Sequence, residues 1–548
     1  MKELRRALVS ISALFASAAL PLAAADPTAD ELLAREPPKY IVEATGKRLN
    51  SFISRDIAIL ARAYAAGHDR KYLDGTVKYM KAAAAYPDWR AKEHYLSASY
   101  IVDAFATALE LCGPDMKAEE RRELEDVLVA KGLRPAALHW FWLVGNNWTQ
   151  VCCAAVSHAA LALRERFPEE SATCLSNCVR ATKSALAAYA PDGCYAEGPS
   201  YWRFATEKTQ AMVEHLKRHL GDDMGISSMP GFMESYEWIK AMRGPTGKLF
   251  NYADGESDRQ EAPAWDVKEI STRVFGGAQP SAVIASKSFF LAAKGGKAEQ
   301  NHAHMDAGSF VFETISGGRA VRWVEDLGTE RYRRIERAKI DIWDFSQSSS
   351  RWSVFRHGPF SHSTFTIDGE LHRVKGFVPL RAVGEGAIEA DCSHLYDGVW
   401  ESAVRSWRVD RNASFHWSDP PRIILRDSFT GVKKDHVYEF GFCTFADAKI
   451  ENGVIVLDKD GQRLCVMARS DGAWNVQDVS KPKRPFEAPN PMAKRISFRR
   501  TLPEGDSWVE FAFFRPVGAR LDGVDWPTKR GEPRMEALLP SRTFYQHK

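Results

Sequence analysis

The sequence predicts a helical N-terminal region followed by an antiparallel β-sandwich, because the spacing of its apolar residues changes once along the chain. From about residue 29 to residue 243, apolar side chains recur at helical spacing, as they do between Ile57 and Tyr64. After about Phe275, apolar and polar residues alternate instead. Runs of helices followed by runs of strands are typical of an α domain joined to a β domain.

Glycine and proline divide the first region into separate helices. They interrupt the apolar stripes at Gly67, Gly113–Pro114, Gly132 and Pro191–Gly193. Because both residue types end helices, this pattern predicts a succession of helical hairpins. The stretch 244–280 is rich in Gly, Asp and Pro and predicts the connection to the sandwich.

Short alternating runs predict the strands of the second region. Two apolar runs between residues 454 and 467 flank the turn Asp458–Gly461, which predicts a hairpin, and Trp508–Phe513 predicts a last strand. We therefore place the helical domain at residues 26–270 and the sandwich at residues 271–548.

The N-terminus has the order of a secretory signal: a basic start, the apolar stretch Ala7–Leu20 and the small residues Ala23–Ala25. The alternative is a buried first helix. No cysteine lies near the predicted cleavage site, and no later run of about 18 apolar residues occurs. We expect residues 1–25 to be a signal peptide and the mature protein to be periplasmic or secreted by a bacterium, without a membrane anchor.

Composition narrows the choice of partners. The net charge of +3 over 548 residues argues against nucleic acid as the main partner and leaves room for a local basic groove. The nine cysteines include no CxxC pair, so a zinc ribbon is excluded. In an oxidising compartment we expect one or two disulfides, whose pairing stays open, and otherwise small buried thiols. The sequence does not define an oligomeric state.

Three segments carry more polar and aromatic groups than packing requires. Paired asparagines in Val144–Gln150 precede a helical stretch, where the alternative is a simple N-cap. A Gly/Pro loop in Asp192–Arg203 places Tyr201 and Arg203 in the first turn of a helix, a pattern suited to a sugar and its carboxylate. The alternative is a loop plug in which Tyr201 caps its own helix.

The third segment, Asn301–Ser309, contains His302 and His304, which an extended backbone would place on one face. With Asp326 and His362, such histidines have the ligand types of a tetrahedral zinc site. The alternative is that these are unrelated residues on the surface.

Together these segments resemble the heparinase II/III-like lyases, a family that also contains alginate and oligoalginate lyases. The resemblance covers roughly residues 50 to 520 and rests on Gly145–Trp148, Glu197–Arg203, Asn301–His304 with Gly308–Phe310, and His362–Thr364. It implies an incomplete α/α toroid joined to a two-sheet antiparallel β-sandwich, with an acidic polysaccharide in the cleft between them.

The resemblance also implies roles for individual residues. Asn147 matches the group that neutralises a uronate carboxylate, Tyr201 the catalytic tyrosine and His302 a cleft-facing histidine. His304, Asp326 and His362 match the ligands of a structural zinc ion in that family. Two departures stand out: Trp148 replaces the histidine of many members, and Ser346–Trp352 lacks a second tyrosine.

The predicted function is that of a polysaccharide lyase, which cleaves a uronic-acid polymer such as a glycosaminoglycan or alginate by β-elimination and leaves an unsaturated uronate. We expect substrate contacts from Asn146, Trp148, Glu197, Trp202 and Arg203. We also expect the positive charge of Arg203 or of protonated His302 to lower the pKa of Tyr201.

Two other functions stay open. A glycoside hydrolase would need two carboxyl groups, for which Asp192 with Glu197 and Asp254 with Glu256 are available. A non-catalytic glycan-binding protein is the other alternative, and Trp148 in place of histidine favours it.

Overall fold

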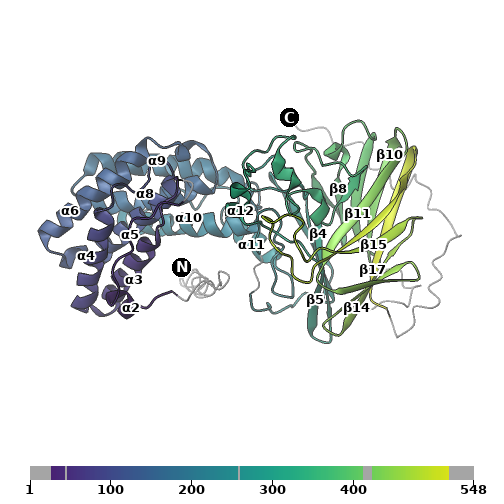
Figure 1. Ribbon diagram of the computed structural model, residues 1–548, viewed down its shortest axis with the longest axis horizontal. Helices are drawn as coiled ribbons and strands as arrows, with labels where there is room; N and C mark the ends of the chain where they lie inside the picture. The colour runs from purple at the N-terminus through teal and green to yellow at the C-terminus, as the bar shows by residue number, and fades with distance from the viewer. Residues whose placement is uncertain (1–25, 44–45, 257–259, 411–421, 517–548) are drawn as a thin grey trace.

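The computed structural model describes residues 26–43, 46–256, 260–410 and 422–516, which form a helical part and a sheet part side by side (Figure 1). The predicted signal peptide lies outside these residues. The helices of the first part are α2 (Ala29–Leu33), α3 (Phe52–Gly67), α4 (Arg70–Ala84), α5 (Tyr95–Cys112), α6 (Ala118–Leu128), α7 (Arg134–Ala137), α8 (Asn147–Leu163), α9 (Pro168–Leu186), α10 (Pro199–Leu220) and α11 (Ser235–Ala241).

Helices α5, α8 and α10 form the centre of the helical part. Helix α8 packs against α5, α9 and α10, and its residues from Val151 to Leu163 are nearly all buried. One described segment, Tyr95–Asp115, is long and apolar enough to cross a membrane, but 67% of its apolar window is buried inside the protein. This burial is typical of a core helix.

The second part consists of three antiparallel sheets. The strands of the five-stranded sheet follow chain order: β1 (Ser271–Phe275), β2 (Ser281–Ala285), β3 (Phe289–Lys294), β4 (Phe310–Ser316) and β5 (Arg319–Val324). The eight-stranded sheet has the order β12 (Asp447–Glu451), β13 (Val454–Lys459), β14 (Gln462–Ala468), β17 (Gly505–Phe514), β10 (Arg422–Val432), β9 (Ser402–Asp410), β8 (Ala387–Asp391) and β7 (Leu380–Gly384). The four-stranded sheet has the order β15 (Ala473–Asp478), β16 (Lys494–Leu502), β11 (His436–Thr444) and β6 (Phe365–Ile367).

The central strands of the five-stranded sheet join the two parts, because β2, β3 and most of β4 are buried on both faces. In β2, Val283 and Ala285 pack into the core of the helical part, whereas Ala282 and Ile284 pack into the core of the sandwich. Alternate residues of a strand point to opposite faces, so one strand serves two cores. The short helix α12 (Tyr332–Arg337) lies at the junction beside α10 and α11 (Figure 1).

Two expectations need correction. The resemblance implied a two-sheet sandwich, but the chain forms a third sheet, β1–β5, because these strands are covered on both faces. The expected disulfides are absent: all nine cysteines lie in the described residues as buried free thiols. The predicted hairpin is confirmed, with Lys459 paired to Gln462 across its turn.

Candidate active site

The N-terminus of α8 positions the paired asparagines. The side chain of Asn146 accepts a hydrogen bond of 3.0 Å from the backbone N–H of Trp148 and so caps the helix. Capping satisfies a backbone donor that the first turn leaves unpaired. The N-cap alternative is therefore confirmed for the Asn146 oxygen, and a substrate contact from its NH₂ group stays a prediction.

Asn147 is buried and held by Glu197. One Glu197 oxygen, Oε2, accepts from Asn147 Nδ2 (2.8 Å), from the Asn147 backbone N–H (3.2 Å) and from the Tyr195 hydroxyl (3.0 Å). The other oxygen accepts from Asn301 Nδ2 at 2.5 Å. Because these donors occupy the carboxylate and Glu197 is only 3% exposed, its predicted role as a substrate contact is corrected to that of a positioning residue.

The loop before α10 brings this helix against the segment that contains Asp254. Gly198 has a φ of +87°, and a Cβ there would lie 3.3 Å from Ala253 Cβ and 3.4 Å from the carbonyl oxygen of Tyr252. Glycine allows both the left-handed backbone and the close approach. The first turn of α10 then presents Tyr201, which is half-buried, at the junction of the two parts.

Trp202 turns away from Tyr201 into the helical core. Its ring makes edge contacts with Tyr236 and Trp238, and the side chain is 3% exposed. Successive helical residues are rotated by about 100°, so neighbours in sequence face different environments. The predicted substrate contact of Trp202 is therefore wrong.

The other two predicted substrate residues are half-buried. Trp148 packs against His94 and Trp140, with ring centroids 4.7 Å away in each case. Arg203 lies on α10 near Glu207, where burial raises the pKa of the Glu207 carboxyl and the Arg203 charge opposes that rise. Substrate contacts from Trp148 and Arg203 stay predictions.

His302 lies between Tyr201 and Asn147. Its ring stacks on that of Tyr201, with centroids 3.5 Å apart, and its Nε2 is 3.3 Å from Asn147 Nδ2. The backbone of His302 is left-handed, with a φ of +63°, and its carbonyl accepts a 3.0 Å hydrogen bond from the N–H of Asp254. Such backbone strain in a residue other than glycine is concentrated at functional sites.

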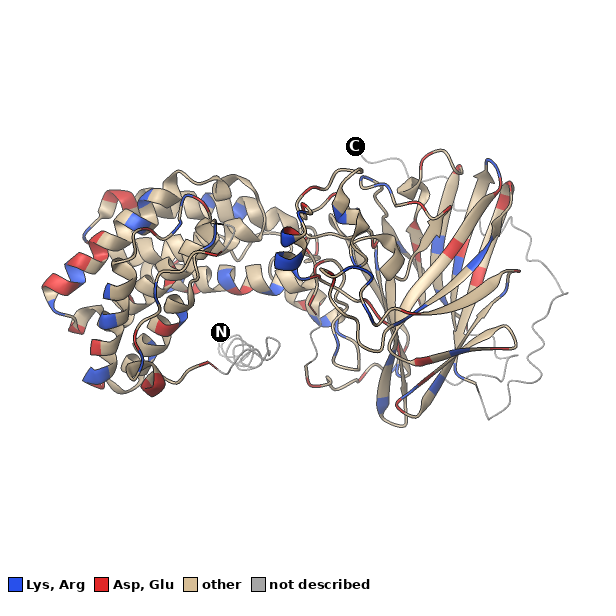
Figure 2. Ribbon diagram, in the orientation of Figure 1, with Lys and Arg blue, Asp and Glu red and all other residues tan. Residues whose placement is uncertain are grey.

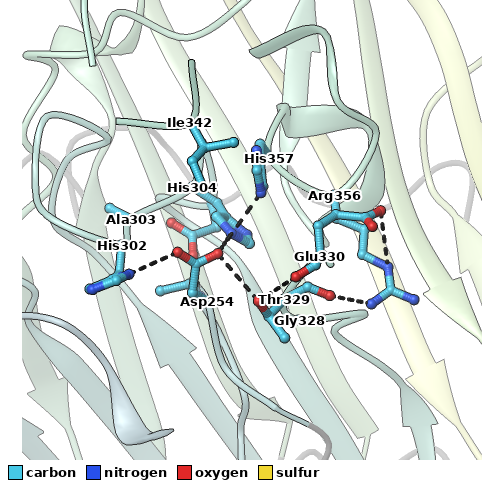
Figure 3. A network of polar contacts seen from close by, with 12 residues as sticks. Asp254, His302, Ala303, His304, Gly328, Thr329, Glu330, Ile342, Arg356 and His357 are labelled. Atoms are coloured by element: carbon cyan, nitrogen blue, oxygen red, sulfur yellow. Dashed lines mark hydrogen bonds and ion pairs between the residues drawn. The ribbon is translucent and has the colours of Figure 1, made fainter. Parts of the chain in front are cut away.

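Asp254 connects His302 to His304, as Figure 3 shows. His302 Nδ1–H donates to Asp254 Oδ2, and His304 Nε2–H donates to Oδ1, each at 3.0 Å. Burial alone would raise the pKa of Asp254, but these hydrogen bonds and the nearby Arg351 guanidinium hold it well below its usual value. The ionised carboxylate fixes His302 with Nδ1 protonated, which leaves the Nε2 lone pair facing Asn147.

A second tyrosine completes the polar network. The hydroxyl of Tyr332 donates to Asp254 Oδ2 at 2.6 Å and lies 3.2 Å from the hydroxyl of Tyr201. Burial, together with the Asp254 carboxylate, raises the pKa of Tyr201 above its ordinary value. The expected lowering by Arg203 or His302 is therefore wrong, because the carboxylates of Asp254, Glu197 and Glu256 oppose ionisation of the phenol. Tyr201 rests as a protonated phenol.

The predicted metal ligands come together only in part. Ligand atoms of His304, His362 and Asp306 lie within 4.8 Å of one another, whereas the predicted Asp326 contacts His362, with Oδ2 2.9 Å from Nδ1. Asp306 follows His304 by two residues in the same loop. Its two oxygens already interact with the Lys294 ammonium and with the backbone N–H of Ala253.

The histidine nitrogens nevertheless suit a cation. His304 uses Nε2–H for Asp254, and its buried Nδ1 has no hydrogen-bond partner among the described residues. His362 uses Nε2 for the carbonyl of Arg356 at 3.0 Å, so its Nδ1 lone pair and Asp326 Oδ2 face each other. Two acceptors at this distance require a proton or a metal ion between them. Two imidazoles and a carboxylate form a donor set that suits zinc.

Comparisons with known proteins follow this geometry. A search of curated proteins returned no significant match. Residues 281–495 match the family described as Heparinase II/III-like, C-terminal. The matched residues begin in β2 and end in β16. The match confirms the predicted resemblance for the sheet part, which contains the motifs Asn301–His304 and His362–Thr364.

Solved structures resemble nearly the whole chain. A heparan sulfate lyase HepC mutant from Pedobacter heparinus aligns with a TM-score of 0.61 at 13% identity, covering 92% of this chain and 85% of that chain. A structure of heparinase III aligns with a TM-score of 0.61 at 12% identity, covering 86% and 78%. At such identities the likeness shows the fold, a helical toroid joined to antiparallel sheets, and confirms the predicted fold class.

Sequence reasoning missed three residues of the polar network at the junction of the helical and sheet parts. Asn301 was visible in its motif but was given no role, although it binds Glu197. Asp254 was considered only as a hydrolase acid. Tyr332 carried no signal, because it lies outside the motif segments, and only the fold brings it to Asp254.

Proposed function

We propose that this protein is a polysaccharide lyase that cleaves a uronic-acid polymer by β-elimination. The observation that carries the proposal is the contact of a phenol, an imidazole and an amide from separate segments: Tyr201 stacks on His302, and His302 Nε2 is 3.3 Å from Asn147 Nδ2. Elimination beside a carboxylate requires an acid, a base and a hydrogen-bond donor to that carboxylate, and these three groups supply them.

His302 is the proposed base. Its Nδ1–H is held by Asp254, so Nε2 has a lone pair that can accept the proton alpha to the carboxylate. The electrons of the broken C–H bond then form a carbon–carbon double bond and expel the glycosidic oxygen. Tyr201, protonated at rest, donates its proton to that oxygen, and the adjacent Tyr332 hydroxyl provides a route to replace it.

Asn147 is the proposed hydrogen-bond donor to the substrate carboxylate. Glu197 occupies one N–H of its amide, and the other points to His302 over a long 3.3 Å contact. A substrate carboxylate that accepts this second N–H stabilises the charge that develops as the proton leaves, and it also releases His302 Nε2. Loss of one such donor typically costs about 3 kcal/mol of transition-state stabilisation.

The junction also carries positive charge that suits an acidic polymer. Figure 2 shows basic residues on α12, where Arg333, Arg334 and Arg337 are exposed next to Tyr332. Arg333 pairs with Glu43 at 2.7 Å, which leaves the other two as the main candidates for polymer contacts. The N-terminal pattern supports export to the periplasm or medium, where such a polymer would be met.

Zinc is the cofactor that we propose for the sheet part. His304 and His362 would hold it through Nδ1, and Asp326 would supply the oxygen, since both oxygens of Asp306 are already engaged. Zinc would there act as a structural cross-link between the loops of His304 and His362. In this arrangement Asp254 orients His304 from behind, as carboxylates commonly do for metal-bound histidines.

The two pairs of acids that the hydrolase alternative named are not available as pairs. Both oxygens of Asp192 accept from the backbone N–H of Gly276 at 2.9 Å, and Glu197 is occupied by its donors. In the second pair, Asp254 is buried between two histidines and cannot serve as the second acid. Only the exposed Glu256 of that pair is then accessible. Neither pair therefore provides the acid and base that hydrolysis needs.

The test is an ultraviolet assay of the purified protein on heparan sulfate, chondroitin sulfate and alginate. Elimination creates a conjugated uronate that absorbs, so absorbance should rise together with new reducing ends on at least one polymer. New reducing ends without absorbance would show hydrolysis, and binding without either product would leave the glycan-binding alternative. Metal analysis of wild-type protein and His362→Ala should show one zinc equivalent less in the variant; equal contents would refute the sheet site.

A further inference from the structure

The helical part contains a second cluster of histidines and carboxylates that the proposed elimination does not use. Glu110 on α5, His158 on α8 and His215 on α10 each place a ligand atom within 4.8 Å of the other two. His219, one turn after His215, places Nε2 3.6 Å from Glu110 Oε1. Three helices thus converge on one point.

His158 is arranged like a metal-binding histidine. It is 2% exposed, its Nδ1 lies 2.9 Å from Asp103 Oδ1, and its Nε2 lies 3.0 Å from Glu110 Oε2. Asp103 is itself held by Lys208 Nζ at 3.3 Å. Each ring nitrogen faces a carboxylate oxygen, so without a metal ion both carry hydrogen, with Nδ1–H donating to Asp103 and Nε2–H to Glu110. A metal ion would take the place of the hydrogen on Nε2. A carboxylate behind one nitrogen is also the usual support of a metal-bound imidazole.

His215 adds an available nitrogen. Its ring lies 3.8 Å from that of His158, and its buried Nδ1 has no hydrogen-bond partner among the described residues. His215 and His219 are four residues apart on one helix, a spacing that places two histidines on the same face for a metal ion.

We propose that Glu110, His158 and His215 form a second transition-metal site, suited to zinc, with His219 as a fourth ligand. Nitrogen and carboxylate donors in tetrahedral number favour zinc over calcium or magnesium. Binding replaces the proton between His158 Nε2 and Glu110, and that proton is released to solvent. Arg218, which pairs with Glu110 Oε1 at 2.5 Å, leaves Oε2 for the metal.

The site would cross-link the helices that carry the proposed active site. Helix α8 begins at Asn147, and His158 lies 11 residues further on, about 16 Å along the axis. Helix α10 carries Tyr201 in its first turn and His215 in its last turns. A metal ion here would fix α8 and α10 relative to each other without touching the substrate.

The experiment titrates zinc into chelator-treated full-length protein by calorimetry. Wild type should bind one zinc equivalent more than His215→Ala, whereas His394→Ala, which removes an exposed histidine in the sheet part, should match wild type. Glu110→Gln, which keeps the side-chain shape, should weaken this equivalent at least tenfold. Repeating the titration in buffers of different ionisation enthalpy should show a released proton that is missing in His215→Ala. Equal stoichiometry in wild type, His215→Ala and Glu110→Gln would overturn the proposal.

Discussion

The imidazole ring of His302 lies flat against the phenol ring of Tyr201, with centroids 3.5 Å apart and planes inclined by 16°. Tyr201 comes from the first turn of a helix, and His302 from the loop between β3 and β4. The two rings share a carboxylate, because His302 bonds Asp254 directly and Tyr201 reaches it through Tyr332. Acid and base are therefore positioned by one buried charge.

Tyr201→Phe tests the acid. Phenylalanine keeps the stacked ring and removes only the hydroxyl, so the melting temperature should change little while kcat for elimination falls by about 10²- to 10⁴-fold. Tyr332→Phe is the matched control, since it removes the hydroxyl that contacts Tyr201 but leaves the proposed donor. It should lower kcat less. Wild-type turnover in Tyr201→Phe would exclude the proposed proton transfer.

Glu197→Gln tests the positioning of Asn147. Glutamine replaces one acceptor oxygen by an NH₂ group that must face the donors of Asn147, Tyr195 or Asn301. We expect a loss of about 1–3 kcal/mol in unfolding free energy and a fall in kcat larger than any rise in KM, because the amide that responds to developing charge is displaced. Asp192→Asn, which also alters a carboxylate contact with a backbone N–H, should affect stability alone. Loss of kcat in both variants to the same extent would mean that Glu197 is merely structural.

The fold class could be predicted because the residues that helices and strands bury recur at different spacings in the sequence. The change from helical to alternating spacing separates the regions that end with α11 and begin with β1. Alternation indicates which residues of a strand share a face, but it says nothing about which strands pair. The third sheet was missed for this reason: β2 is apolar on both faces because it serves two cores.

The candidate site could be predicted motif by motif but not as a network. Asn147, Tyr201 and His302 stand in short segments whose residue types point to their chemistry, and the fold brings them together. Trp202 was wrongly predicted to contact substrate because it follows Tyr201 in the sequence, whereas the helix turns its side chain toward the core. Asp254 was misassigned because only tertiary structure shows that its neighbours are histidines rather than a second acid.

The arginines of α12 give a prediction about charge. Arg334→Ala with Arg337→Ala should raise KM for a polyanionic substrate and reduce the dependence of kcat/KM on ionic strength, because exposed charges steer an acidic polymer and are screened by salt. Turnover at saturation should stay near the wild-type value, since neither residue belongs to the Tyr201–His302 network. Arg319→Ala, an exposed arginine on β5, serves as control. An unchanged salt dependence in the double variant would remove α12 from substrate binding.

His94 gives a prediction about pH. Its Nδ1 caps α5 by accepting from the backbone N–H of Ser97 at 3.2 Å, and its ring contacts Trp148, next to Asn147. Burial, with the nearby Arg48 charge, lowers the pKa of His94 to about 4. An unfolded histidine titrates near 6.5, so the unfolded chain takes up the proton first as pH falls. The stability contributed by neutral His94 is present above pH 6.5 and is lost between pH 6.5 and about 4.

His94→Asn separates this effect from other titrations, because asparagine is also an N-cap acceptor but carries no proton. Urea unfolding at pH 7 should give wild type and variant similar free energies. At pH 4.5 the wild type should have lost about 1–2 kcal/mol more unfolding free energy than the variant. This value is smaller than the full pKa shift of His94 would give, because the ring is only half-buried. His394→Asn, at an exposed position, should follow the wild-type curve. If His94→Asn loses stability in parallel with wild type, the cap is not the group that titrates, and the acid sensitivity of the Asn147 segment must come from another residue.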